Sequence, residues 1–136
     1  MIAVSKPKKR RGTSIASVKR RIWELNKKIV RMRDKNKCQR CLKYVDGKQA
    51  ETSHVVPKSH GNILRFDTQN LKVFCFSCHR WWHANPTESG DWFKHTFPER
   101  YAYIETRKNE TVKWSINDFL ALEEALKEEL KIRLTT

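Results

Sequence analysis

The stretch from Cys75 to His83 carries most of the chemistry that this sequence offers. Its residues are Cys-Phe-Ser-Cys-His-Arg-Trp-Trp-His, so two thiols and two imidazoles fall within nine positions. A second Cys-x-x-Cys pair lies upstream, at Cys38 and Cys41. Two such pairs supply the four thiolates of a tetrahedral structural zinc site. We therefore expect Cys38, Cys41, Cys75 and Cys78 to bind one structural Zn²⁺ ion, with no position left open for catalysis.

The histidines suggest a second, different site. His79 and His83 are four positions apart in a segment expected to be helical, which places both rings on one face, where they can bind a metal ion. His54 precedes Pro57 at the end of an expected strand, and a neutral imidazole is a suitable general base near pH 7. A base and a metal ion together fit the hydrolysis of a phosphodiester bond.

Three short segments resemble the HNH, or ββα-metal, nucleases. They are Ser-His-Val-Val-Pro around His54, Gln-Asn-Leu around Asn70 and Cys-Phe-Ser-Cys-His around His79, and the resemblance covers roughly residues 37–85. The resemblance implies that His54 is the general base and that Asn70 holds a neighbouring loop and orients His54. It also implies that His79 binds a catalytic divalent ion (Mg²⁺, Mn²⁺ or similar) and that the products carry 5′ phosphates.

The sequence Leu-Arg-Phe-Asp at positions 64–67, followed by Asn70, also resembles phage recombination nucleases of the Rap (NinG) type. That resemblance implies branched DNA as substrate, such as four-way junctions or D-loops in phage recombination. The main alternatives are a non-catalytic zinc-stabilised DNA-binding module and an HNH nicking or packaging-associated nuclease on duplex DNA. A protein that binds or cuts RNA is a weaker alternative, because a metal site does not distinguish the sugar.

The sequence departs from the family pattern at Ser53, where the family most often has Asp or a second His as a metal ligand. Serine is a poor ligand for a hard divalent ion. We expect the catalytic ion to be held by His79, His83 and the Ser53 position. Water and substrate phosphate complete the set, or an acid such as Glu51 or Asp67 does so. A degenerate site that only binds is the alternative.

The basic charge is concentrated at one end of the chain. The 136 residues carry 29 Lys and Arg against 15 Asp and Glu, and residues 1–37 hold 14 of the basic residues and only two acidic ones. A basic arm on a nearly neutral globular part indicates a polyanionic partner, and we favour DNA over an acidic membrane or a solubilising role. The expected DNA contacts are Lys8, Lys9, Arg10, Arg11, Lys19, Arg20, Arg65 and Arg80.

Apolar segments are short throughout the sequence. None approaches the roughly 20 residues that cross a bilayer, and the N-terminal Met-Ile-Ala-Val is too short for the apolar part of a signal peptide. We expect an intracellular protein without a membrane partner, in the cytoplasm or nucleoid of a cell such as a phage-infected host. Thiols stay reduced there, which favours metal binding over disulfides.

These patterns predict an α+β protein with a small zinc-stabilised ββα-metal core flanked by helices. We expect a disordered basic arm over 1–12, a basic amphipathic helix over 13–36, the nuclease core over 37–85 and a helical segment over 86–136. Within the core, strands over 50–56 and 71–74 precede a helix over 77–84. The segment 85–90 should break the chain, and Pro98 should open a helix that ends near residue 108.

Two of the expected helices have apolar faces. The first has a narrow seam, which consists of Ile15, Val18, Ile22, Leu25, Ile29 and Met32. This seam either docks on the protein's own core or pairs with a second copy, and a homodimer through residues 15–32 would supply the two sites that junction cleavage needs. The last helix should be capped by Ser115 with Asp118, and Trp114 should pack on Phe119. Its apolar face consists of Phe119, Leu122, Leu126 and Leu130, and its outer face of Glu123, Glu124, Glu128 and Glu129.

Overall fold

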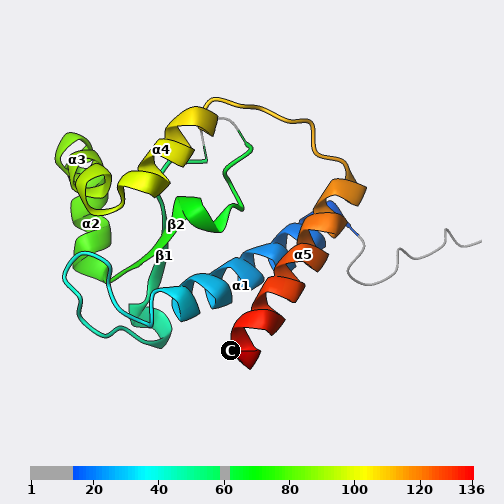
Figure 1. Ribbon diagram of the computed structural model, residues 1–136, viewed down its shortest axis with the longest axis horizontal. Coiled ribbons are helices and arrows are strands. Elements are labelled where there is room, and N and C mark those ends of the chain that lie inside the picture. Colours follow the sequence, from blue (N-terminus) through cyan, green and yellow to red (C-terminus); the bar gives the residue numbers. More distant parts are fainter. Residues whose placement is uncertain (1–13, 59–61) are drawn as a thin grey trace, which may run out of the picture.

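The computed structural model describes residues 14–58 and 62–136 (Figure 1). The predicted arm over 1–12, with Lys8, Lys9, Arg10 and Arg11, lies outside them. The elements in chain order are α1 (Ile15–Arg33), η1 (Gly47–Gln49), β1 (Glu51–His54), η2 (Thr68–Asn70), β2 (Leu71–Phe74), α2 (Phe76–Ala84), α3 (Pro86–Thr96), α4 (Pro98–Arg107) and α5 (Ile116–Thr135). The predicted α+β class is confirmed. No helix in the described ranges is both long and apolar enough to cross a membrane.

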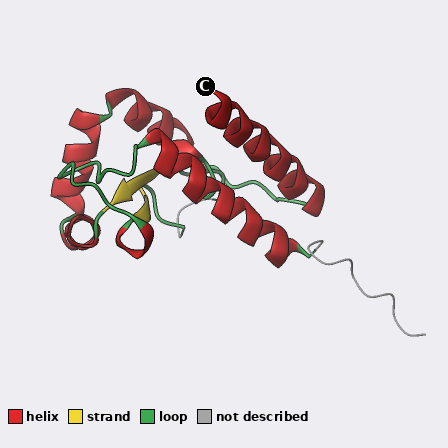
Figure 2. Cartoon of the chain, turned by 90° about the horizontal axis from the view of Figure 1, so that it is seen from below, coloured by secondary structure: helices red, strands yellow, loops and turns green. Residues whose placement is uncertain are grey.

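The centre of the fold is a two-stranded antiparallel hairpin, in which Ser53 pairs with Lys72 and His54 with Leu71. Successive side chains of a strand point to opposite faces. The face that carries Phe74 packs on Trp82 of α2, with ring centroids 5.9 Å apart. The opposite face carries His54 toward α1. The hairpin therefore lies between α1 and α2 (Figure 2).

Helix α1 packs along α5 in both views (Figures 1 and 2). Ser14 caps α1 by accepting a hydrogen bond from the backbone N–H of Ser17. The seam residues Val18, Ile22 and Ile29 are fully buried, and they share one apolar cluster with Phe119 and Leu126 of α5. The centre of the seam thus docks on the protein's own core, which is one of the two predicted alternatives. Ile15 and Met32 at its ends are exposed, and a homodimer through residues 15–32 stays a prediction.

Three further expectations concern the C-terminal half. The predicted break over 85–90 is wrong, because α3 begins at Pro86, where proline fits the first turn of a helix. The capping box of Ser115 and Asp118 is confirmed, as is the stacking of Trp114 on Phe119, with centroids 5.0 Å apart.

The outward placement of Glu123 is also wrong, because its side chain is buried between α1 and α5. Arg21 of α1 binds both of its carboxylate oxygens, one of them at 3.0 Å.

Candidate active site and metal centres

The four cysteines converge on one point. The Sγ atoms of Cys38, Cys41, Cys75 and Cys78 all lie within 4.8 Å of one another. Those of Cys41 and Cys75 are 3.8 Å apart, close to the roughly 3.8 Å that tetrahedral Zn–S bonds of about 2.3 Å require. Each pair comes from a tight turn, and the second turn opens α2 with Cys75 as its cap. The donor set fits a structural zinc ion.

Hydrogen bonds favour the thiolate form of Cys75, which is the form that binds a metal ion. Burial alone would raise the pKa of Cys75, but donation from the Ser77 hydroxyl and the backbone N–H of Cys78 lowers it to about 6. The guanidinium of Arg40 lies 3.7 Å from the Cys78 sulfur and stacks over the Trp81 ring. The cluster thus has a thiolate ready at neutral pH and a positive charge beside it. Trp81 and Trp82 serve in packing, since both lie in or against the core.

His79 and His83 lie on one face of α2, with their Nε2 atoms 3.0 Å apart. Two imidazoles on one ion, with bonds of about 2.0–2.1 Å, place their nitrogens roughly 3.0–3.4 Å apart. The Nδ1–H of His79 donates to the carboxylate of Glu51, which leaves Nε2 for a metal. A carboxylate behind a ligand histidine fixes its tautomer and raises its basicity. The spacing of these two nitrogens fits a divalent ion, and Glu51 orients the ring of His79.

Ser53 is placed differently from the expectation. Its side chain is buried and accepts a hydrogen bond of 2.9 Å from the ammonium of Lys72, and it does not line the cavity that His79 and His83 share. Because Ser53 and Lys72 are register partners, both point to the same face of the hairpin. The structure thus holds Ser53 against Lys72 and does not bring it to the cavity of His79 and His83. Its role as a metal ligand stays a prediction. Asp67 is also engaged elsewhere, since it accepts a hydrogen bond from the Tyr103 hydroxyl.

His54 is held on two sides. Trp23 of α1 stacks on its ring, with centroids 5.3 Å apart and planes 4° apart. Its Nε2 lies 3.1 Å from the backbone carbonyl of Arg65. A carbonyl only accepts, so Nε2 carries the proton and Nδ1 keeps a free lone pair. Burial, helped by the nearby charges of Lys58 and Lys72, lowers the pKa of His54. The ring is thus a neutral base with one free nitrogen.

Asn70 is fully buried and holds the loop that follows β1. Its Oδ1 accepts from the backbone N–H of Val56 at 2.8 Å, and its Nδ2 donates to the carbonyls of Val56 and Leu64 at 3.1 and 3.2 Å. Val56 lies two residues after His54, and Leu64 directly precedes Arg65, whose carbonyl accepts the hydrogen bond from the ring. The hydrogen bonds of Asn70 thus hold the backbone on both sides of His54.

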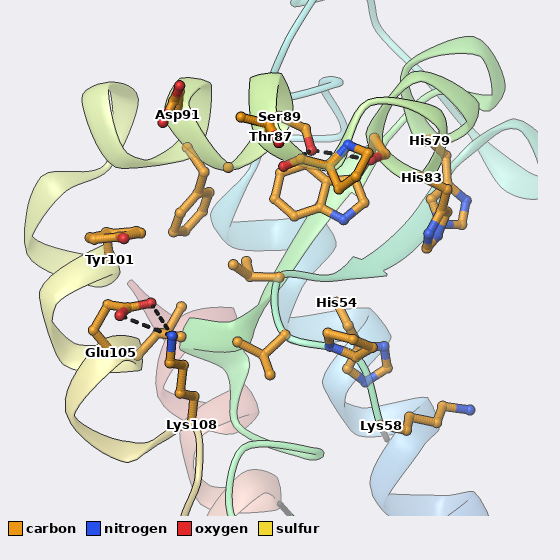
Figure 3. Close-up of a pocket in the computed structure, with 18 of the residues that line it drawn as sticks. His54, Lys58, His79, His83, Thr87, Ser89, Asp91, Tyr101, Glu105 and Lys108 are labelled. Atoms are coloured by element: carbon orange, nitrogen blue, oxygen red, sulfur yellow. Dashed lines mark hydrogen bonds and ion pairs between the residues drawn. The ribbon is translucent and has the colours of Figure 1, made fainter. Parts of the chain in front are cut away.

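One cavity of about 900 Å³ brings the three histidines together. In Figure 3, His54 lies across the cavity mouth from His79 and His83, with the end of β1 between them. The cavity continues between the segment after β1 and helices α3 and α4, toward Tyr101 and Glu105.

A second, smaller groove of about 220 Å³ meets the cavity at Trp23, His54 and Lys58. The other residues that line it are Ala16, Lys19, Arg20, Arg65 and Phe66. The structure therefore gathers three of the expected DNA contacts, Lys19, Arg20 and Arg65, beside the expected base. Arg80 is exposed on α2 and lines neither space.

Sequence reasoning missed two side chains that the structure brings to the site. Nothing in the sequence assigned a role to Trp23 in the first helix. Glu51 was expected only as a direct metal ligand. A signal for Glu51 existed in principle. It stands three residues before His54 at the start of the strand that pairs with the segment leading into the metal-binding helix. No local pattern pointed to Trp23.

The fold and the cysteine cluster together fit a zinc-stabilised HNH core, a small α+β unit with a hairpin followed by a helix. In agreement, residues 38–85 match the family model for HNH endonuclease. That region contains the hairpin, the four cysteines, the three histidines and Asn70. No curated protein and no solved structure matches the chain.

Proposed function

We propose that the protein is a metal-dependent DNA endonuclease that hydrolyses phosphodiester bonds, with His54 as the general base. The observation that supports this most directly is the shared cavity, which holds a neutral imidazole with a free nitrogen opposite a two-imidazole metal site. The match of residues 38–85 to the HNH endonuclease family supports the same class.

In this proposal Nδ1 of His54 takes a proton from the attacking water. The Arg65 carbonyl and the Trp23 ring keep the imidazole in one tautomer and one orientation. Asn70 holds the backbone at Val56 and Leu64, close to His54 and Arg65. A divalent ion bound by His79 and His83 would polarise the scissile phosphate and stabilise the departing oxygen. Glu51 keeps His79 in the tautomer that presents Nε2.

DNA is the proposed substrate because the groove beside His54 is basic. Lys19, Arg20, Lys58 and Arg65 line it without an acidic residue among them. Each phosphate contact adds about 0.9 to the slope of log affinity against log salt. We propose that the basic residues of the N-terminal arm, including Lys8, Lys9, Arg10 and Arg11, extend this path. Branched DNA is the proposed substrate shape, on the resemblance to the recombination nucleases.

The test is the nicking of supercoiled plasmid by the full chain with Mg²⁺, Mn²⁺, Ni²⁺ or Zn²⁺. His54→Ala should abolish nicking and keep DNA binding, because the ring is only half-buried and carries no part of the core. His95→Ala is the matched control, since His95 is exposed on α3 and lines no described cavity. The same enzyme should then be compared on duplex, nicked, flapped and four-way DNA.

The second function to consider is a zinc-stabilised module that only binds DNA. The observation that favours it is the placement of Ser53, which leaves two imidazoles as the protein ligands of the divalent ion. Binding without nicking under every metal would support this module and contradict the endonuclease. Nicking that persists in His54→Ala would contradict the assigned base.

A further inference from the structure

The cavity beyond the catalytic histidines differs in character from the groove on their other side. The groove along α1 is lined by four cations. The cavity is walled by apolar and aromatic side chains, namely Val55, Val56, Trp82, Phe93, Tyr101 and Ile104. Its two carboxylates, Asp91 and Glu105, are balanced by Lys58 and Lys108, and Glu105 pairs with Lys108 at 3.0 Å. The groove therefore attracts phosphates more strongly than the apolar part of the cavity does.

The size of this cavity suits an organic group. Its volume of about 900 Å³ lies within the roughly 300–1,000 Å³ of sites that enclose small molecules. Figure 3 shows Tyr101 of α4 on the wall opposite the histidines. Aromatic side chains that face a nucleic-acid path stack unpaired bases, whatever their sequence. A base inside a duplex cannot reach such a recess unless it leaves the stack.

We infer that this cavity binds an unpaired nucleobase next to the scissile phosphate, with Tyr101 as its stacking platform. The inference rests on the proposed nuclease function and specifies its substrate: DNA in which a nucleotide is already unpaired, as at bulges, flaps and junctions. A fully paired duplex could fill the cavity only if a base unpaired and unstacked, which costs free energy. The basic groove then carries the backbone while the cavity receives the base.

Gly90 of α3 offers a way to close the cavity without damaging the fold. It lines the cavity, and a Cβ built on it would meet no atom within 4 Å. Gly90→Leu therefore adds a side chain whose Cβ meets no neighbouring atom, within a helix, where leucine is favoured over glycine. Gly90→Ala is the matched control, since it gives the same backbone change with little added volume.

The experiment measures DNA binding by the full chain in the His54→Ala background, so that no cleavage intervenes. The probes are a duplex with one unpaired nucleotide, the same duplex with an abasic residue at that position, and the fully paired duplex. The base-containing probe should bind roughly tenfold tighter than the abasic one. Gly90→Leu and Tyr101→Ala should bring that ratio close to one. Gly90→Ala and Tyr44→Ala should keep it, because Tyr44 is exposed and lines no described cavity.

Equal binding of the base-containing and abasic probes by the unsubstituted cavity would overturn the inference, as would a ratio that survives Gly90→Leu. Thermal unfolding of each variant shows whether it is folded, and Tyr101→Ala decides the matter if Gly90→Leu does not fold. Failure of the nuclease proposal would appear separately, as the absence of nicking by the unsubstituted protein with every metal. The two results are thus distinguishable.

Discussion

Trp23 and His54 stack with their ring planes only 4° apart, although they belong to different parts of the chain. Trp23 lies in α1, outside residues 38–85, and His54 ends β1 inside them. The helix whose basic residues line the smaller groove therefore also supplies the ring that stacks on His54. Under the proposed function, this contact would couple the placement of DNA along α1 to the orientation of the imidazole.

Loss of the Trp23 ring should impair cleavage more than binding. Trp23→Ala removes the stacking partner, and we expect kcat to fall roughly tenfold or more, because small misplacements of a catalytic group are costly. Trp23→Phe keeps a flat ring and should retain most of the rate. Steady-state cleavage of a short DNA by both variants measures this. A Trp23→Ala protein that is folded and fully active would remove the positioning role.

The pH dependence of cleavage should reflect the lowered pKa of His54. Burial disfavours the imidazolium, so the pKa of His54 lies below the ordinary value of 6.5. The neutral base is then present at and above pH 6.5, and kcat/KM should fall only as the pH drops through the lowered value. Trp23→Ala, which admits water, should move this acid limb upward toward 6.5. His95→Ala should leave it in place, and an acid limb above 6.5 in the unsubstituted protein would contradict the assignment.

Glu51→Gln should weaken the divalent-metal site while the fold stays intact. The amide cannot match the carboxylate as acceptor for the Nδ1–H of His79, and changes of this kind typically lower metal affinity or activity about 10–100-fold. Calorimetric titration of the zinc-loaded protein with Mn²⁺ or Ni²⁺ measures the affinity. Glu124→Gln, at an exposed position of α5, is the control. Unchanged affinity in Glu51→Gln would show that Glu51 does not support the metal site.

Removal of the structural zinc should unfold the core. Structural zinc sites contribute about 10–16 kcal/mol of apparent binding free energy, which is available only to the folded chain. Cys41→Ser, or a strong chelator, should therefore abolish cooperative thermal unfolding as followed by circular dichroism. Ser77→Ala is the control, because it removes a hydrogen bond to Cys75 but no ligand. A chelated protein that still unfolds cooperatively at the same temperature would exclude a zinc-dependent fold.

The ion pair between α1 and α5 predicts an acid-sensitive contribution to stability. The guanidinium of Arg21 lowers the pKa of Glu123 through its hydrogen bonds. Stability from this pair is thus present above pH about 4.5, the ordinary pKa of Glu, and is lost as the pH falls through the lowered value. Glu123→Gln should reduce the melting temperature at pH 7 and reduce it less at pH 3. Glu124→Gln should change neither, and an equal loss at both pH values would argue against the ion pair.

The groups proposed for the site could be predicted from the sequence because the prediction depends on residue type and short spacing. Two Cys-x-x-Cys pairs indicate a zinc site from their residue type and spacing alone. His79 and His83 share a helix face because they are four residues apart. The role of Asn70 as a clamp on the backbone followed from the family resemblance, and its three hydrogen bonds fit that role.

Short-range signals were less reliable where a buried partner decided the outcome. The spacing of Glu123 predicted an exposed side chain. It is buried instead, because it pairs with Arg21, which lies 102 positions away in the sequence. Ser53 stands where the HNH resemblance led us to expect a metal ligand, and its hydroxyl accepts a hydrogen bond from the buried Lys72. Proline at position 86 suggested a break, whereas it starts α3.

The sequence by itself determined which groups are available for metal binding and proton transfer, because covalent spacing fixes which of them share a turn or a helix face. Only the tertiary structure decided that α5 covers the seam of α1, that Trp23 stands behind His54, and that α3 and α4 enclose an apolar recess beside the histidines. Those contacts join residues far apart in the chain. They arise from the burial of complementary surfaces, which no local pattern encodes.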